Sequence, residues 1–391
     1  MVRELPGEQS EDQGGVPRAA PPPPRPRLRD HGVVVGHLPT GPLNAITDVM
    51  GVRVGHVTLF AGTGPLREGH GPVRTGVTAV LPHGRNLFRE KVVGAVHTIN
   101  AFGKIVGTTQ VAELGVIETP IILTNTLSIG SAVEGLIEHA LRSNPEIGVT
   151  TGSVNPVVGE CNDGALNDMR GRHVKPWHVL EAVAQATEGP VSEGVVGAGT
   201  GMSCYGWKGG IGTASREAEV RGTRYTVGTL VLANFGSSRD LVIANVPIGG
   251  HVRQPANGGA HSFGPGSCVV VVGTDAPASA RQLGRIARRV QSGIARTGTY
   301  GEHGSGEYAV AFSTANAVPH FSTAATVAST ELTEDGAVMD VLFEATVEAT
   351  EEAILNALFV ADTVRGVDDH VRFGLPIDLV VALLRSPASE A

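Results

Sequence analysis

Aromatic residues make up only 4% of this 391-residue chain, and cysteine occurs three times, at Cys161, Cys204 and Cys268. A small, odd number of cysteines argues against a disulfide scaffold and is typical of a reducing compartment. The sequence lacks an uninterrupted apolar run of about 18 residues, which excludes a membrane-spanning helix. The first residues, MVRELPGEQSEDQGG, contain no apolar segment of the secretory type, so we expect a cytoplasmic protein.

An excess of positive charge is also missing. Lysine and arginine number 30 against 38 aspartates and glutamates, which gives a net charge of −8. A negatively charged surface repels the phosphates of nucleic acids and anionic lipids. Binding to nucleic acid or to a membrane surface is therefore not expected.

Glycine is abundant instead, with 53 residues, which indicates tight turns and closely packed backbone layers. Proline is concentrated at the N-terminus, where 7 of the 24 prolines lie within residues 1–30. This segment has few apolar side chains and cannot bury enough surface to become ordered. Residues 1–30 are predicted to form a disordered tail, and residues 31–391 a single folded domain.

Beyond the tail, short apolar runs alternate with glycine-rich turns and helical patterns. The continuous β-branched run Cys268–Val272 is typical of a strand buried on both faces. Further strands are predicted over 52–59, 77–81, 121–125, 225–233 and 241–246, and helices over 131–141, directly after Asp275-Ala276-Pro277, and over 341–361. Strands and helices mix throughout the chain, so the expected fold class is a layered α/β domain.

Several well-known motifs do not occur. The glycine-rich segment 197–201 lacks the spacing of a phosphate-binding loop and is interpreted as a tight turn. No HExxH, CxxC or GxSxG sequence is present, so neither a zinc centre nor an α/β-hydrolase nucleophile is indicated. We expect no metal and no cofactor.

A serine at the start of the most apolar strand is the first candidate for chemistry. Ser267 follows Gly266 directly before the valine run. A glycine allows close approach to its carbonyl group and tolerates strained backbone angles, as an N→O acyl shift at a Gly-Ser bond requires. Taken alone, the same residues also suit an ordinary junction between a turn and a strand.

Two other segments carry polar side chains that could assist this serine. In an extended Gly304-Ser-Gly-Glu307 segment, Ser305 and Glu307 point to the same face, where a hydroxyl and a carboxylate can relay a proton. The loop 158–168 is dense in short hydrogen-bond acceptors. A solvated turn and a capped turn are the alternative interpretations of these two segments.

Seven segments in order resemble the DmpA family, peptidase family S58. This is the group of self-processing L-aminopeptidases/D-esterases (D-amidases) and β-aminopeptidases. The similarity runs from about Arg29 to Arg385 and is carried by GPLNAITDVMGVRVGHVTL, ETPIILTNTLSIGSA, GECNDGALNDMRGRHV, GVVGAGTGMSCYGWKGGIGTASR, GTLVLANFG, GSCVVVVGTDAP and GSGEYAVAFSTAN.

The resemblance implies a four-layer α/β/β/α sandwich like that of the N-terminal-nucleophile hydrolases and the ornithine acetyltransferases. It implies self-cleavage between Gly266 and Ser267 into an α chain, 1–266, and a β chain, 267–391. Ser267 would be the nucleophile, supported by Ser305 and Glu307, with Asn234 donating to the oxyanion. It further implies small peptide, amide or ester substrates and a homotetramer of processed pairs.

The sequence departs from the family at one place. The family's NDG-x-LND loop often has a tyrosine at x, and this chain has Ala165. The missing ring would open a subsite beside the scissile bond, unless Tyr205 or Tyr308 takes its place. Asp163 in the same loop is a candidate partner for the substrate's ammonium group, and an Asx turn is the alternative.

Three functions remain open on the sequence. The first is an aminopeptidase or amidase acting through an acyl-enzyme on Ser267. The second is an endo-acting amide hydrolase or acyl transferase related to the nylon-oligomer hydrolases, which use threonine at the nucleophile position. The third is a non-catalytic member that has lost processing.

Overall fold

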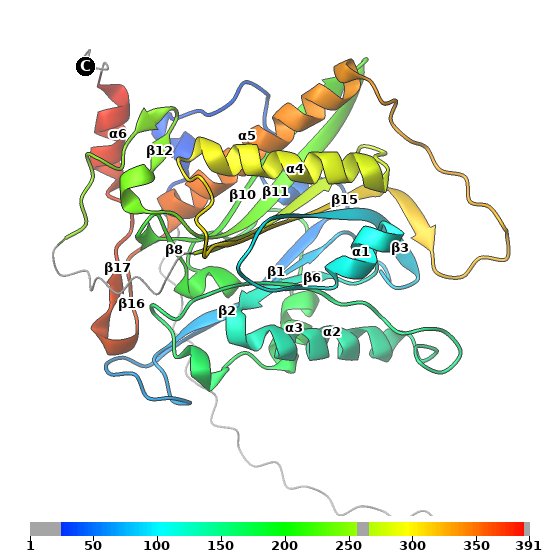
Figure 1. The fold of residues 1–391 in the computed structure, drawn as a ribbon, viewed down its shortest axis with the longest axis horizontal. Helices are drawn as coiled ribbons and strands as arrows, with labels where there is room; N and C mark the ends of the chain where they lie inside the picture. The colour runs from blue at the N-terminus through cyan, green and yellow to red at the C-terminus, as the bar shows by residue number, and fades with distance from the viewer. Residues whose placement is uncertain (1–24, 256–265, 387–391) are drawn as a thin grey trace, which may run out of the picture.

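The computed structural model describes residues 25–255 and 266–386 and shows four layers (Figure 1). Two β-sheets face each other in the middle, and helices cover the outer face of each. The predicted α/β/β/α sandwich is confirmed.

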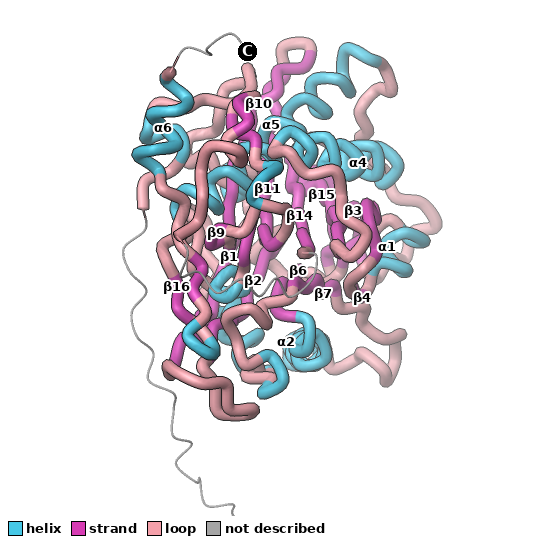
Figure 2. Tube along the Cα trace, turned by 60° about the vertical axis from the view of Figure 1, so that its left-hand side comes forward, coloured by secondary structure: helices cyan, strands magenta, loops and turns pink. Residues whose placement is uncertain are grey.

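The larger sheet has six strands in the order β10-β11-β14-β15-β3-β5, which Figure 2 shows side by side from β10 to β3. Their bounds are β10 Gly210–Val220, β11 Thr223–Asn234, β14 Ser267–Thr274, β15 Gly306–Pro319, β3 Glu90–Ala101 and β5 Val116–Ile117. β14 is buried along its whole length between β11 and β15, as its continuous valine run predicts.

The second sheet has five strands in the order β1-β2-β6-β7-β4. Their bounds are β1 Arg53–Ala61, β2 Val73–Leu81, β6 Ile121–Asn125, β7 Val157–Cys161 and β4 Ile105–Val106. Three two-stranded hairpins complete the strands: β8 Ser203–Cys204 with β9 Trp207–Lys208, β12 Val242–Ile243 with β13 Val246–Pro247, and β16 Val364–Arg365 with β17 Val371–Arg372.

Helices form the outer layers. Their bounds are α1 Thr108–Leu114, α2 Ile129–Ser143, α3 Pro176–Ala184, α4 Ala280–Arg296, α5 Gly336–Val360 and α6 Ile377–Arg385. α4 and α5 cover the six-stranded sheet, whereas α2 and α3 cover the five-stranded one (Figure 1). None of the helices in the described residues is both long and apolar enough to cross a membrane.

Alternating residues of each strand divide the hydrophobic core into separate layers. On β14, Val270 and Val272 pack toward α4 and α5, whereas Val269 and Val271 pack between the two sheets. A third cluster lies between the five-stranded sheet and helices α2 and α3. Side chains on even and odd positions of β14 therefore enter different layers, and this decides where the functional groups point.

Three predicted elements need correction. Residues 241–246 form a small hairpin, β12–β13, because Ala244 and Asn245 adopt positive φ angles that no continuous strand accommodates. The helix expected directly after Pro277 begins at Ala280, since Ser279 and Gln282 form its capping box. Helix α5 begins at Gly336, five residues before the predicted start, where the Asp335 carboxylate accepts from the Val338 amide.

The predicted tail also ends earlier than residue 30. Residues 1–24 lie outside the described residues, but residues 25–30 are held on the domain. Leu28 is fully buried, and the Arg27 side chain donates to the Thr213 carbonyl at 2.6 Å. The predicted end of the tail lies too far along the chain. Arginine and proline dominate residues 25–30, although the one leucine in this segment, Leu28, is a core residue.

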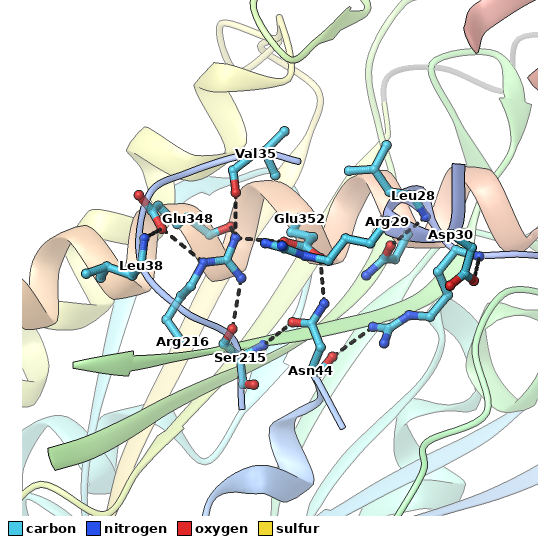
Figure 3. Close-up of polar contacts among 12 residues, drawn as sticks. Leu28, Arg29, Asp30, Val35, Leu38, Asn44, Ser215, Arg216, Glu348 and Glu352 are labelled. Atoms are coloured by element: carbon cyan, nitrogen blue, oxygen red, sulfur yellow. Dashed lines mark hydrogen bonds and ion pairs between the residues drawn. The ribbon is translucent and has the colours of Figure 1, made fainter. Parts of the chain in front are cut away.

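A buried polar cluster attaches this N-terminal segment to β10 and α5 (Figure 3). The Arg216 guanidinium contacts Glu348 at 2.9 Å and Glu352 at 2.7 Å, and all three side chains are almost completely buried. Arg29 pairs with the other Glu352 oxygen at 2.6 Å, and Asn44 donates to that same oxygen. Two arginines and two glutamates thus neutralise one another inside the outer layer.

Candidate active site

Ser267 is the first residue of β14, and the sheet register brings the other predicted residues beside it. Asn234, the last residue of β11, lies directly opposite Ser267 in the antiparallel pair. Gly306, the first residue of β15, lies opposite Ser267 on the other side, in the parallel pair. Three segments that are distant in the sequence therefore meet at one edge of the sheet.

The side chains of Asn234 and Ser267 point into the layer between the sheets, where they meet the end of β7. The Asn234 amide nitrogen donates to the Ser267 hydroxyl at 3.4 Å and to the Asn162 carbonyl at 3.0 Å. The Asn162 backbone N–H also donates to the Ser267 hydroxyl at 3.4 Å. Two N–H donors, one from the end of β11 and one directly after β7, thus lie next to Ser267 Oγ, beside the place where a carbonyl attacked by this oxygen would develop its oxyanion.

The orientation of the Asn234 amide is fixed from its other end. Its carbonyl oxygen accepts from the Ser203 backbone N–H at 2.8 Å. A flipped amide would place two donors against each other there, so the NH₂ group must face Ser267.

Gly266 is packed tightly against β11 at the bond predicted to be cleaved. A Cβ atom on Gly266 would lie 2.0 Å from the Asn234 carbonyl oxygen and 2.4 Å from the Phe235 Cα. Its own carbonyl accepts from the Gly306 N–H at 3.2 Å. Only glycine fits this position, and the carbonyl group before Ser267 is polarised by a backbone donor. The preceding Gly264 and Pro265 lie outside the described residues.

Ser305 and Glu307 share a face, as predicted, but it is not the face of the Ser267 hydroxyl. Glu307 pairs with Cys268, whose side chain packs toward the α4–α5 layer. Burial raises the pKa of the Glu307 carboxyl above its usual range, and the nearby Ser305 hydroxyl opposes this shift. Ser305 Oγ and Glu307 Oε1 are buried and have no hydrogen-bond partner among the described residues. They are adjacent to the backbone of Ser267, rather than to its hydroxyl.

A cavity of about 400 Å³ opens at the Gly266–Ser267 bond. It is lined by Ala101, Phe102, Gly103, Lys104, Thr126, Glu160, Asn162, Gly266, Ser267 and Gly304. The Ser267 residue is only 5% exposed, so its access to a substrate is through this cavity.

Glu160 supplies the carboxylate that lines this cavity. Its side chain is 3% exposed and is held by the Lys104 backbone N–H at 2.9 Å and by the Thr126 hydroxyl. The Lys104 ammonium group lies 3.9 Å away and is 56% exposed. Because the Lys104 ammonium group lies beyond hydrogen-bond distance and is largely exposed, the nearly buried Glu160 carboxylate can form a charged hydrogen bond with a second ammonium group in the cavity.

Neither of the two predicted substrate-binding residues is among the residues that line this cavity. Asp163 is completely buried, which raises the pKa of its carboxyl to about 7, and it accepts from the Asn167 side chain at 3.0 Å. Ala165 is packed in the interior, and its carbonyl is 3.3 Å from the His370 ring. In the described residues, Ala165 therefore faces the interior rather than this cavity.

The two tyrosines considered as replacements differ in their positions. The Tyr205 hydroxyl is buried against Thr297 at 2.7 Å, and Tyr205 packs with the α4–α5 layer. Tyr308 packs between the sheets, with its ring against Gly103 in the cavity wall. Of the two tyrosines, it is therefore Tyr308 that lies next to the cavity.

The other polar side chains of the loop 162–168 serve the loop itself. Asn167 accepts from the Arg74 N–H, and Asp168 accepts from the amides of Gly69, Gly71 and Gly171. The capped-turn interpretation is confirmed for Asp168, which caps the turn at Gly171, whereas Asn167 and Asp168 also bind the loop to residues 69–74. The sequence analysis missed Glu160 and Asn162, although both stand in the quoted GECND segment at the end of an apolar strand.

The family model for peptidase family S58 matches residues 44–372 of this chain. The chain belongs to this family. The chain is 44% identical to the β-peptidyl aminopeptidase BapA of Sphingosinicella microcystinivorans over 372 residues, 92% of each chain. As an S58 protein, the chain is a peptidase, and its relatives of known activity are aminopeptidases.

Solved structures support the same S58 assignment. The PH0078 protein of Pyrococcus horikoshii OT3 has a TM-score of 0.86 and 52% identity, covering 92% of this chain and 98% of that one. The L-aminopeptidase D-Ala-esterase/amidase of Ochrobactrum anthropi, described as a variant of the Ntn hydrolase fold, has a TM-score of 0.85 and 38% identity, covering 92% and 98%. In the described residues of this S58 chain, no group of three His, Cys, Asp or Glu side chains could hold a metal ion.

Proposed function

We propose that this protein is a self-processing serine aminopeptidase that removes N-terminal residues from small peptides, amides or esters. The observation that carries the proposal is the convergence of the Asn234 amide and the Asn162 N–H on Ser267 Oγ, at the wall of a cavity. A hydroxyl beside two aligned donors is the arrangement needed to form and stabilise a tetrahedral intermediate.

The first reaction is cleavage of the chain itself. Ser267 Oγ attacks the Gly266 carbonyl carbon, the C–N bond breaks, and the hydroxyl proton passes to the Ser267 nitrogen. Water then hydrolyses the resulting ester, which leaves a Gly266 carboxylate and a Ser267 amine. Ser305 and Glu307 flank Gly306, the register partner of Ser267, so we expect the new amine to form close to their buried oxygens and to donate to them.

The second reaction is turnover of substrate. The free amine of Ser267 has a reference pKa of about 7.7–8.0 and serves as base for its own hydroxyl once neutral. The Asn234 amide and the Asn162 N–H then stabilise the developing oxyanion, and each such donor typically contributes about 2.7–4 kcal/mol. The product amine leaves, and water releases the acyl group from Ser267.

The Glu160 carboxylate favours exopeptidase over endo-acting hydrolysis. We assign it to the substrate's terminal ammonium group, because a charged hydrogen bond to a nearly buried carboxylate would select chains with a free N-terminus. An endo-acting amide hydrolase has no use for an anion at this place. Because the relative from Sphingosinicella microcystinivorans is a β-peptidyl aminopeptidase, β-aminoacyl substrates are the first to test.

The assignment is tested with Ser267→Ala and Ser267→Cys. A denaturing gel of the wild type should show bands of roughly 27 and 13 kDa, from the residue fractions of 40.3 kDa. Ser267→Ala should stay intact and inactive, whereas the thiol variant should retain some cleavage. An intact wild-type chain with full activity on aminoacyl p-nitroanilides contradicts the proposal.

The role of Glu160 is tested separately. Glu160→Gln should raise KM for aminoacyl amides by roughly tenfold or more while kcat changes less, because the lost interaction binds ground state and transition state alike. N-acetylated substrates should be poor substrates for both proteins. Equal KM values for the wild type and Glu160→Gln would contradict the proposal that Glu160 binds the substrate's ammonium group.

We further propose that the processed pairs assemble into a homotetramer in the cytoplasm. The support is the resemblance to the family and the scarcity of cysteine. Light scattering on the purified processed protein tests the assembly, and a monomer contradicts it.

A further inference from the structure

A lysine is buried behind the active site without a carboxylate. Lys208, the last residue of β9, is completely buried. Its ammonium group donates to the Gly199 carbonyl at 3.0 Å and the Gly209 carbonyl at 2.8 Å. Over residues 25–255 and 266–386, no carboxylate lies within ion-pair distance of it. The Lys208 amine is thus satisfied by two backbone carbonyls rather than by an opposite charge.

The two carbonyl groups that accept from Lys208 lie at the two ends of residues 199–209, the segment that orients the Asn234 amide. Gly199 precedes the β8–β9 hairpin, and Gly209 follows it. Within the hairpin, Ser203 lies directly opposite Lys208. The Ser203 N–H is the group that donates to the Asn234 side-chain carbonyl at 2.8 Å. Lys208 therefore joins both ends of a short segment whose middle fixes the amide facing Ser267.

We propose that Lys208 is a positioning residue for the oxyanion donor: it holds the 199–209 segment so that the Ser203 N–H keeps the Asn234 amide pointed at Ser267. This inference rests on the proposed function, since it assigns Lys208 an effect through Asn234. It places no part of Lys208 in contact with the substrate.

The chemistry of lysine suits this task. Burial lowers the pKa of Lys208 to about 7; nearby Cys204 opposes the shift, and nearby Arg372 adds to it. Both the ammonium form and the neutral amine have at least two N–H donors, so the two carbonyl contacts persist on either side of neutral pH. Arg372 gives the hairpin a second attachment, because its Nε donates to the Ser203 hydroxyl at 3.0 Å.

The test is a double-mutant cycle with Lys208→Met and Asn234→Ala. Methionine fills the space of the lysine stem and removes the donors. Lys208→Met should lower kcat about tenfold with KM within a factor of two, because a misplaced donor is lost mainly in the transition state. Asn234→Ala should lower kcat by roughly 10²–10³. In the double variant, Lys208→Met should add nothing, because the amide that it positions is absent.

Lys91→Met is the matched control. Lys91 is a largely buried lysine that pairs with Glu118 on the outer edge of the sheet. Its loss should lower the melting temperature without changing kcat per processed active site. All kcat values are divided by the processed fraction on a denaturing gel. The same cycle is measured on the rate of Gly266–Ser267 cleavage after cell-free synthesis, so a slowly maturing Asn234→Ala does not block the test.

The outcomes separate the two claims. If Asn234→Ala keeps wild-type kcat and cleavage, the oxyanion assignment of the proposed function fails. If Asn234→Ala is impaired but Lys208→Met matches the wild type, or if the two losses multiply in the double variant, the positioning role fails while the proposed function stands.

Discussion

Single residues are most tightly constrained where backbone contacts backbone, as at Gly266. The close approach of β11 leaves no room for a Cβ atom there, and it holds the Gly266 carbonyl against the Gly306 N–H. The glycine before the nucleophile is thus a packing requirement as well as a chemical one.

Gly266→Ala should therefore fold but process slowly. The methyl group must push β14 away from β11, and a displacement of about 1 Å at a reacting group costs roughly a hundredfold in rate. Gly152→Ala is the control, since a Cβ on that exposed glycine meets nothing within 4 Å. Cleavage is followed on gels after cell-free synthesis. Equal cleavage rates for both variants would show that β11 can move away from residue 266 without slowing cleavage.

Glu307 gives a prediction for stability against pH. Its pKa is raised in the folded, uncleaved chain, so the native state holds its proton more tightly than the unfolded state does. This contribution to stability is complete below the unfolded pKa of about 4.3 and is lost as the pH rises through the folded pKa.

Glu307→Gln, measured in the uncleaved Ser267→Ala background, should then raise the melting temperature at pH 7, because glutamine mimics the protonated acid. The advantage should shrink as the pH falls toward 4. In the Ser267-containing enzyme the same change should slow maturation. A stability difference that does not vary with pH would show that Glu307 has the same pKa in the folded and unfolded states.

At the scale of elements, the outer layer depends on the buried charges that join β10, α5 and the N-terminal segment. Burial alone would raise the pKa of Glu352, but Arg29 and Arg216 reverse this and hold it below its usual range. The stability that Glu352 contributes is present above its unfolded pKa and is lost as the pH falls through the folded value.

Arg216→Met should cost about 3–5 kcal/mol, because it leaves Glu348 buried without its ion-pair partner and removes one of the two arginines from Glu352. Arg142→Met, which breaks an exposed pair with Glu138, should cost less than about 1 kcal/mol. Urea unfolding of both variants in the Ser267→Ala background measures the difference. Similar losses would mean that the buried cluster is no stronger than a surface pair.

The elements differ in how far the sequence could predict them. The strand at 267–274 follows from its continuous β-branched run, and the helix at 129–143 follows from the helical pattern of its apolar residues. The hairpin at 242–247 could not be separated from a strand, since positive φ angles at Ala244 and Asn245 leave no sign in the composition.

The residues of the candidate site also differ in how far the sequence could predict them. Ser267, Asn234 and Glu307 could be selected by resemblance, and the sheet register brings them together. Asp163 was selected and Glu160 was not considered, because only the fold shows that Glu160 lines the cavity, whereas Asp163, its near neighbour in the sequence, is buried. The face on which Ser305 and Glu307 point depends on strand pairing, which spacing alone does not give.

At the scale of the whole molecule, processing should not separate the fragments. β14 starts the second fragment and pairs with β11 of the first, and α4 and α5 pack on the same sheet. Residues 1–266 and 267–391 thus share their core, and we expect them to elute together in size exclusion and to separate only in denaturant. Two independent native species would contradict a shared core.

The N-terminal boundary gives a further prediction. Deleting residues 1–24 should leave activity and assembly unchanged. Deleting residues 1–30 removes the buried Leu28 and the Arg29 partner of Glu352, and should cost more than about 3 kcal/mol. Urea unfolding of the two truncations distinguishes them. Equal stability would mean that residues 25–30 contribute nothing to the fold.

The position of Ser267 inside the sheet has a consequence for protein turnover. The proposed cleavage would create a chain end at Ser267, a residue that is only 5% exposed in the intact chain and that lines the cavity. Cellular factors that recognise or trim N-terminal residues need an extended, accessible terminus, and Ser267 is paired with strands on both sides. We therefore expect the new terminus to stay out of reach of such factors for as long as the β chain stays folded.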